Sequence, residues 1–372
     1  MPYLCPSFIS RYLETTEKKR KRSFLRNGSL LLKELIASSD GKYNPFRIYS
    51  EEELKKATNN YDPNCIFHIN TFGKWYKGTI EGRVVPVCKS SWLPVHVKHL
   101  TGKWSEMLVN NWRNDAVTDV SISAMLSGHK NVLKLLGCCL ETTVPMVVYE
   151  YAGNRTLCDR IHTTAGSDSQ PLPWKSRLEI AREIAHAIAY LHTAFAKPII
   201  HRKIRPSNIL LDQNDVPKLL DFSSSMTIRE GETVKVDTYA GSLGYMSADI
   251  GFEVNEKVDV HNFGSLLLEL LTGKDPREIH ELAMGKDYSF PYCEDGLHCL
   301  AHHTENYLSC DSIEDIVDST FFLTEGGGSE QQQQLRQWEA VKELALKCWA
   351  NPKEERPTMV EVTKQLRQIE LS

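Results

Sequence analysis

Apolar positions in the middle of the chain recur at helical spacing. One buried helix face is marked by residues three or four positions apart: Leu178, Ala181, Ile184, Ala185, Ile188 and Leu191. Residues 260–272 are densely apolar on every side and end at Gly273, which is typical of a buried helix. Two closing helices are expected over residues 340–349 and 358–369. The second half of the chain is therefore predicted to be mainly helical.

The first half shows the alternation of short strands instead. Pro86 removes one hydrogen-bond donor from the second of these strands. Before them, Ser50 and Glu53 form a capping-box pattern that predicts the start of a short helix. The strands are expected within residues 61–80 and at residues 84–89, 132–136 and 146–149. Strands followed by helices predict an α+β fold in two lobes.

The domain boundaries follow from these patterns. Residues 1–45 are expected to form an N-terminal extension with a basic run, and residues 46–60 a short helix leading into the domain. The main domain is then residues 61–370, with a small β-rich lobe at about 61–150 and a larger helical lobe at about 151–370. A flexible loop is predicted at residues 326–334, because glycine and glutamine dominate there.

Composition narrows the class of protein. The chain has 372 residues, 41% hydrophobic and 25% charged, as in an ordinary soluble domain. The net charge of −4 gives no nucleic-acid signature, and no window of eighteen residues is apolar enough to predict a membrane span. The ten cysteines are irregularly spaced and no secretory signal precedes them, so we expect reduced thiols and a cytoplasmic location.

Two charged or metal-binding patterns leave alternatives open. The five cations of Lys18–Arg22 fit a solvated helix face, a nuclear localisation patch or a weak peripheral contact with anionic lipid, and the solvated face is favoured. Cys293, Cys299, His302 and His303 lie close together, but their spacing matches no common zinc motif. We expect a surface loop there and predict no metal site.

A polar segment in the second half points to specific chemistry. Residues 201–208 read His-Arg-Lys-Ile-Arg-Pro-Ser-Asn, and residues 221–223 read Asp-Phe-Ser. A protein kinase catalytic loop reads His-Arg-Asp, four residues, Asn, and its metal loop reads Asp-Phe-Gly. The spacing is that of a kinase, and the expected fold is a bilobal protein kinase fold.

Lys203 stands where a kinase has its catalytic aspartate. An ammonium group cannot accept the proton of a substrate hydroxyl, and general-base catalysis contributes roughly 10²–10⁴-fold. Asn208 and Asp221 remain, so both are candidates for a degenerate nucleotide site. Ser223 replaces the glycine of the metal loop. No catalytic residue is predicted, and the general-base position is assigned to Lys203.

The phosphate-binding parts are also altered. Of the glycine-rich lid only Gly73 remains, because His68 and Asn70 occupy the other two glycine positions. Lys89 is the candidate for the strand lysine that contacts the phosphates. The glutamate that should pair with it falls on Val120. The adjacent Asp119 makes a substitute ion pair possible but not favoured, because one helix position rotates a side chain by about 100°.

Architectural positions are better preserved than chemical ones. Residues 241–249 match the end of an activation segment, and Arg356 is placed to pair with Asp249. Asp259, at the head of the apolar helix, is placed to hold the catalytic-loop backbone near Arg202.

From about Phe46 to Ile369 the chain resembles plant receptor-like cytoplasmic kinases of the wall-associated kinase branch. The segments that carry the resemblance are residues 49–58, 131–139, 147–150 and 259–273. Within that group it is most similar to pseudokinases that pair with a coiled-coil NLR immune receptor. The resemblance implies an adaptor or decoy in plant innate immunity. Its implied partners are the NLR receptor together with pathogen effectors or effector-modified host kinases, at the inner face of the plasma membrane when in complex. The exposed regions that suit such partners are the N-terminal extension, the activation segment Met226–Ala240 and the helical lobe.

Three functions remain open from the sequence. The favoured one is an adaptor that requires no cofactor. A weakly active or unconventional serine/threonine kinase would use Asp221, Asn208 and Lys89 with a displaced base. An ATP sensor would bind ATP and magnesium weakly without turnover.

Overall fold

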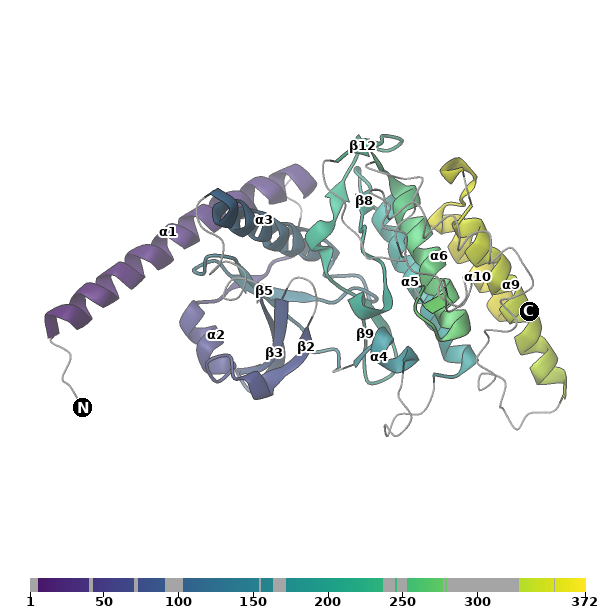
Figure 1. The fold of residues 1–372 in the computed structure, drawn as a ribbon, viewed down its shortest axis with the longest axis horizontal. Helices are drawn as coiled ribbons and strands as arrows, with labels where there is room; N and C mark the ends of the chain where they lie inside the picture. Colours follow the sequence, from purple (N-terminus) through teal and green to yellow (C-terminus); the bar gives the residue numbers. More distant parts are fainter. Residues whose placement is uncertain are drawn as a thin grey trace, which may run out of the picture. The chain divides into compact units, whose positions relative to one another are not determined.

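The fold is described from a computed structural model, shown in Figure 1. It describes residues 6–39, 43–69, 73–90, 103–153, 155–162, 172–236, 245, 253–276, 278–279, 328–350 and 352–372. Two compact units divide the chain: residues 1–152 together with 221–223, and residues 153–220 together with 224–372. The first unit is rich in strands and the second is largely helical, so the predicted α+β class is confirmed.

A six-stranded sheet forms the centre of the first unit. Its order is β1-β5-β6-β4-β3-β2, and all neighbours are antiparallel except β1 and β5. The strands are β1 (Arg47–Ile48), β2 (Ile66–Ile69), β3 (Gly73–Ile80), β4 (Arg83–Ser90), β5 (Leu135–Cys139) and β6 (Met146–Tyr149). A short 3-10 turn, η1 (Pro63–Cys65), leads into β2.

The two faces of this sheet carry different side chains, because successive residues of a strand point to opposite faces. On one face Val85 and Val87 pack with Leu54 and Tyr49 in an apolar cluster. This cluster includes the short helix α2 (Glu51–Ala57), which begins at the predicted Ser50–Glu53 capping box. On the opposite face lie the cross-strand neighbours Trp75, Cys88 and Val147.

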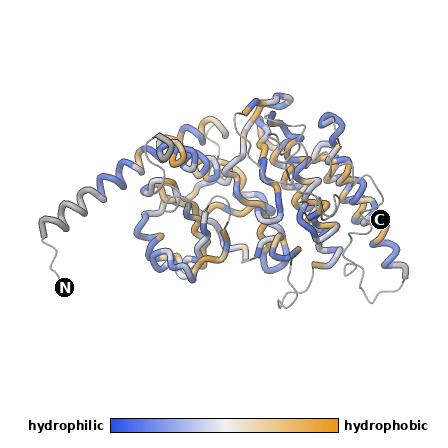
Figure 2. The backbone as a smooth tube through the Cα atoms, viewed as in Figure 1, coloured by the Kyte–Doolittle hydropathy of each residue, from blue (hydrophilic) through white to orange (hydrophobic). Residues whose placement is uncertain are grey.

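Two longer helices complete the first unit. Helix α1 (Pro6–Ser39) lies beside α3 (Lys103–Leu126). The Asn27 amide is buried and donates hydrogen bonds of 2.8 Å to the carbonyls of Leu140 and Thr142. Figure 2 shows that hydrophilic residues dominate the middle of α1 and apolar residues its C-terminal end. The basic run is therefore part of a helix, and its Arg20 forms ion pairs with Glu51 and Glu52 of α2.

Helices form the bulk of the second unit. Those within the described residues are α4 (Leu157–Ile161), α5 (Trp174–Thr193), α6 (Glu256–Thr272), α9 (Gly328–Cys348) and α10 (Met359–Leu371), with the 3-10 turn η7 (Lys353–Glu355). The buried faces predicted for α5 and α6 are confirmed, and Gly273 ends α6 in the left-handed conformation. The glutamine run is helical rather than a loop, because glutamine is a good helix former and no glycine or proline interrupts α9 after Gly328.

Short strands frame the loops of this unit. They are β7 (Arg155–Thr156), β8 (Ile199–Ile200), β9 (Ile209–Leu211), β10 (Pro217–Leu219), β11 (Met226–Thr227), β12 (Val234–Lys235) and β13 (Glu253–Val254), with η3 (Pro206–Asn208) before β9. The turn η4 (Phe222–Ser224) follows β10. Among the described helices, none is long and apolar enough to cross a membrane.

Candidate functional site

The loop between β8 and β9 is held by a buried carboxylate. Asp259 lies in the first turn of α6, fully buried. Its two oxygens accept hydrogen bonds from the backbone N–H groups of His201 and Arg202, at 2.8 and 2.7 Å. Arg202 has a φ of 68°, a strained value for a side-chain-bearing residue, and these two bonds hold it there. The architectural role predicted for Asp259 is confirmed.

Lys203 sits in an otherwise complete loop. The Asn208 amide donates to the carbonyl oxygen of Lys203 at 2.9 Å, and the Lys203 backbone N–H donates to Nδ1 of His201 at 3.2 Å. His201 Nε2 then donates to the carbonyl of Leu220 at 3.1 Å. The side-chain oxygen of Asn208 is buried and has no hydrogen-bond partner among the described residues. The loop thus keeps one oxygen suited to a cation, but it presents an ammonium where a kinase presents its base.

The metal-loop segment belongs to the first unit. Asp221 has a φ of 66°, and its Oδ1 accepts a hydrogen bond of 2.5 Å from the Ser223 hydroxyl. The Phe222 backbone N–H donates to Oδ1 of Asp119 on α3 at 2.9 Å. Ser223 therefore engages one of the oxygens that Asp221 would offer to a metal, and Asp119 fixes the backbone beside it.

Lys89 lies on the other face of the sheet from these carboxylates. Its ammonium is 3.6 Å from the ring centroid of Tyr61, a cation–π contact. Burial lowers the pKa of Lys89, partly offset by the negative charge of Glu51. The structure therefore does not bring Lys89 together with Asp221.

The strand position at which a kinase has its phosphate-binding lysine is occupied by Cys88, not by Lys89. Its thiol is buried, and burial together with the charges of Asp119 and Asp221 raises its pKa well above the ordinary value. Asp119 is the inward-facing acid of α3, and its Oδ2 accepts a 2.5 Å hydrogen bond from the Tyr149 hydroxyl. The acidic position is thus Asp119 rather than residue 120, and the residue opposite it on β4 is a neutral thiol.

An indole fills the same face of the sheet. Trp75 pairs with Cys88 across the strands and is only 2% exposed. Its ring is stacked on that of Tyr149, with centroids 5.2 Å apart and planes 17° from parallel. The rings of Phe67 and His68 make edge-to-face contacts with the indole, with centroids 6.4 and 5.9 Å from its own.

The lid retains one glycine at the start of β3. Gly73 is buried and pairs with Ser90 of β4, while His68 lies on β2. Asn70 falls outside the described residues.

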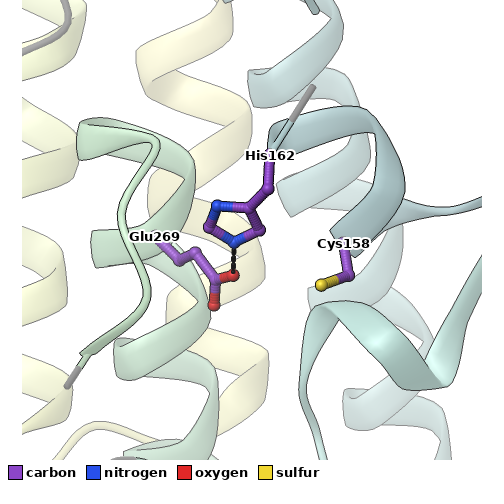
Figure 3. Close-up of side chains that lie close together, drawn as sticks. All are labelled: Cys158, His162 and Glu269. Carbon is purple, nitrogen blue, oxygen red and sulfur yellow. Dashed lines mark hydrogen bonds and ion pairs between the residues drawn. The ribbon is translucent and has the colours of Figure 1, made fainter. Parts of the chain in front are cut away.

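A second polar cluster anchors Tyr245 within the helical unit. Glu269 of α6 is buried and bonds to the Tyr245 hydroxyl and to Nε2 of His162, the latter at 2.7 Å. Figure 3 shows this pair with Cys158 beside it. Burial raises the pKa of Glu269, and the hydrogen bond to Glu269 raises that of His162.

The side chains of Cys158, His162 and Glu269 offer ligand atoms within 4.8 Å of one another, as a metal site would. Glu269 already has a partner on each oxygen. We therefore interpret the cluster as the attachment of Tyr245 to the helices. The Cys293–His303 group and the Asp249 end of the predicted Arg356 pair lie outside the described residues.

The sheet, the carboxylate-held loop and the metal-loop segment together define a protein kinase domain. The family model for protein tyrosine and serine/threonine kinases matches residues 69–366, so the chain belongs to this family.

Some relatives of this chain are named as non-functional pseudokinases, and others are named as kinases. The chain is 36% identical over 362 residues to the "Non-functional pseudokinase ZED1" of Arabidopsis thaliana, covering 96% of this chain and 99% of that protein. It is 35% identical over 362 residues to the "Serine/threonine-protein kinase ZRK1" of the same plant, covering 95% and 94%. It is 40% identical over 261 residues to its "Wall-associated receptor kinase-like 6", covering 69% of this chain and 38% of that one. The resemblance to the wall-associated branch is thereby confirmed.

Proposed function

We propose that this chain is a catalytically inactive, kinase-like adaptor or decoy in plant innate immunity. It binds a coiled-coil NLR receptor and senses pathogen effectors or host kinases that effectors have modified. The observation that carries the loss of catalysis is Lys203, an ammonium at the general-base position of a loop whose backbone bonds to Asp259 and Asn208 are kept. Because these bonds are kept, the loss of catalysis is attributed to the side chain of Lys203 and not to a collapsed loop.

Two further features support this proposal. Cys88, a neutral thiol, faces Asp119 and Asp221 where a kinase needs a lysine. One full-length relative is named a non-functional pseudokinase, although another is named a kinase.

The catalytic part is tested by phosphoryl transfer. Purified wild-type protein is incubated with labelled ATP and Mg²⁺ or Mn²⁺, with Asp221→Asn as the matched control. We expect the same background signal from both. Incorporation that disappears in Asp221→Asn would establish the alternative function, a weak or unconventional kinase that uses Asp221 and Asn208.

The adaptor part needs an exposed surface, and α1 supplies one. The face toward α3 carries the buried Asn27, Leu31 and Leu35. On the outer face, Leu32 and Ile36 are 58% and 57% exposed, and Leu25, seven residues before Leu32, is 63% exposed. Positions 25, 32 and 36 share one side of a helix. An apolar stripe on a helix already anchored by its other face suits a protein partner.

Affinity capture from plant cytosol tests this surface. We expect an NLR receptor to be recovered with wild-type protein and lost with Leu32→Glu. Lys33→Glu, an exposed substitution on the same helix, should retain the receptor. The proposed role of the stripe would be contradicted if wild-type protein recovered no NLR receptor, or if Leu32→Glu and Lys33→Glu recovered equal amounts of it.

A further inference from the structure

The face of the sheet that a kinase offers to its nucleotide is occupied here by a side chain of the protein. The strand lysine of a kinase contacts the α- and β-phosphates, so the face that carries it is the nucleotide's face. In this chain that face carries Cys88, since Cys88 lies with Asp119 and Asp221. Trp75, its direct cross-strand partner, lies on the same face and is buried.

We propose that Trp75 is a permanent internal occupant of this nucleotide face, so that the protein folds and works without ATP. Indole and purine are both flat, fused bicyclic aromatic rings, and each makes its favourable contacts through stacking. Trp75 makes such a contact with Tyr149 at a centroid distance of 5.2 Å. A base could stack there only by displacing the indole.

The indole is held by shape rather than by hydrogen bonding. Its Nε1 is buried and has no acceptor among the described residues. Phe67 and His68 close its edges from β2. Trp75→Phe should therefore keep most of the packing, whereas Trp75→Ala leaves a void.

Charge at the far end of the stack also disfavours a nucleotide. Asp119 and Asp221 are both close enough to Cys88 to act on its thiol. A triphosphate placed beside Cys88 would meet two carboxylates before any magnesium were bound, and it would lose the lysine that normally offsets its charge. Ring occupancy and charge thus act in the same direction, and neither depends on the adaptor role proposed above.

Thermal unfolding of the full chain tests this inference with three probes: ATP–Mg²⁺, indole and adenosine. We expect no change in the wild-type Tm at about 5 mM ATP–Mg²⁺. A site with a dissociation constant a hundredfold lower than the ligand concentration would raise it by several degrees. We expect Trp75→Ala to melt lower and to regain part of the loss as indole is added, in a saturable way. Trp338→Ala, which removes a buried indole from the helical unit, serves as the matched cavity control when adenosine is added to Trp75→Ala.

Each outcome decides the inference. A saturable rise of the wild-type Tm with ATP–Mg²⁺ would overturn it, and that arm needs no variant. If Trp75→Ala fails to fold, Trp75→Phe is used in the same measurement. It should fold, have a Tm close to that of wild type, and show no change in Tm when ATP–Mg²⁺ is added. Recovery of Trp75→Ala by indole, and by adenosine in Trp75→Ala but not in Trp338→Ala, would support it. No recovery of folded Trp75→Ala by either ring would refute the claim that the indole stands in for a base.

Discussion

Replacing Asp119 should show whether this buried carboxylate fixes the metal-loop segment. The substitution Asp119→Ala removes the carboxylate that accepts hydrogen bonds from two buried donors, the Tyr149 hydroxyl and the Phe222 backbone N–H. A buried polar group left unsatisfied costs about 1–3 kcal/mol. The two together amount to about 2–6 kcal/mol, from which relief of the desolvated charge subtracts a part. We expect a net loss of about 2–4 kcal/mol, a large share of the 5–15 kcal/mol typical of a folded domain.

A double-mutant cycle isolates the contact with Tyr149. Tyr149→Phe removes the hydroxyl but keeps the ring that stacks on Trp75. A hydrogen bond to a charged group contributes about 1.5–3 kcal/mol, so the Asp119→Ala/Tyr149→Phe pair should be less destabilised than the sum of the single variants by about that amount. Urea unfolding followed by tryptophan fluorescence measures each variant, with an unchanged slope as the check on two-state behaviour.

The control is Glu106→Ala, an exposed acid on the same helix, expected within about 0.5 kcal/mol of wild type. A cost of Asp119→Ala no larger than this control would refute the reasoning. Additive effects in the cycle would refute the Tyr149 contact alone.

Three further predictions concern the helical unit. His261 has its pKa lowered to about 3 by burial and by Arg356, so its stabilising effect is present above pH 6.5 and is lost as the pH falls toward 3. Between pH 6.5 and 4.5 the wild-type free energy of unfolding in urea should fall by about 2 kcal/mol more than that of His261→Gln, and an equal fall in both proteins would contradict this. The raised pKa of His162 acts in the opposite direction: its advantage over His162→Gln should be complete below pH 6.5 and fade as the pH rises through the folded-state pKa. A constant difference in Tm from pH 6 to 9 would count against the Glu269 bond. In Gly264→Ala, the added Cβ would lie 2.5 Å from Cδ1 of Trp349, so we expect a loss of about 1–3 kcal/mol by chemical denaturation, and a neutral effect would show that the packing gives way.

Helical parts of this fold could be predicted from the sequence, because their signals are long and redundant. The buried faces of α5 and α6, the Gly273 end and the Ser50–Glu53 capping box each rest on several residues that agree. The role of Asp259 was predictable for the same reason, since the loop and the helix that it joins are both well marked.

The face of β4 could not be predicted from the lysine alone. A shift of one residue in a strand turns every side chain to the opposite face. The strand predicted at residues 84–89 does not by itself show which face Lys89 occupies, and Lys89 was assigned because a kinase has a lysine at this position. The signal for Cys88 was apolar alternation: Val85 and Val87 share a face with the buried Leu54, which leaves Cys88 on the other. The role of Trp75 could not be predicted, because it depends on the ring that Trp75 stacks on, and the sequence of one strand does not identify its cross-strand neighbours.

The altered positions of the first unit also contact one another, and this bears on whether catalysis could return. Trp75 stacks on Tyr149, Tyr149 bonds to Asp119, and Asp119 bonds to the backbone of Phe222. A lysine introduced at Cys88 would have to enter a buried, close-packed site between Asp119 and the indole, so its gain from the carboxylate is opposed by overpacking. Restoring the base alone, as in Lys203→Asp, changes none of these contacts. We therefore expect Lys203→Asp to remain without phosphoryl transfer in the labelled-ATP assay, and activity regained by this single change would show that the contacts around Trp75 do not exclude the nucleotide.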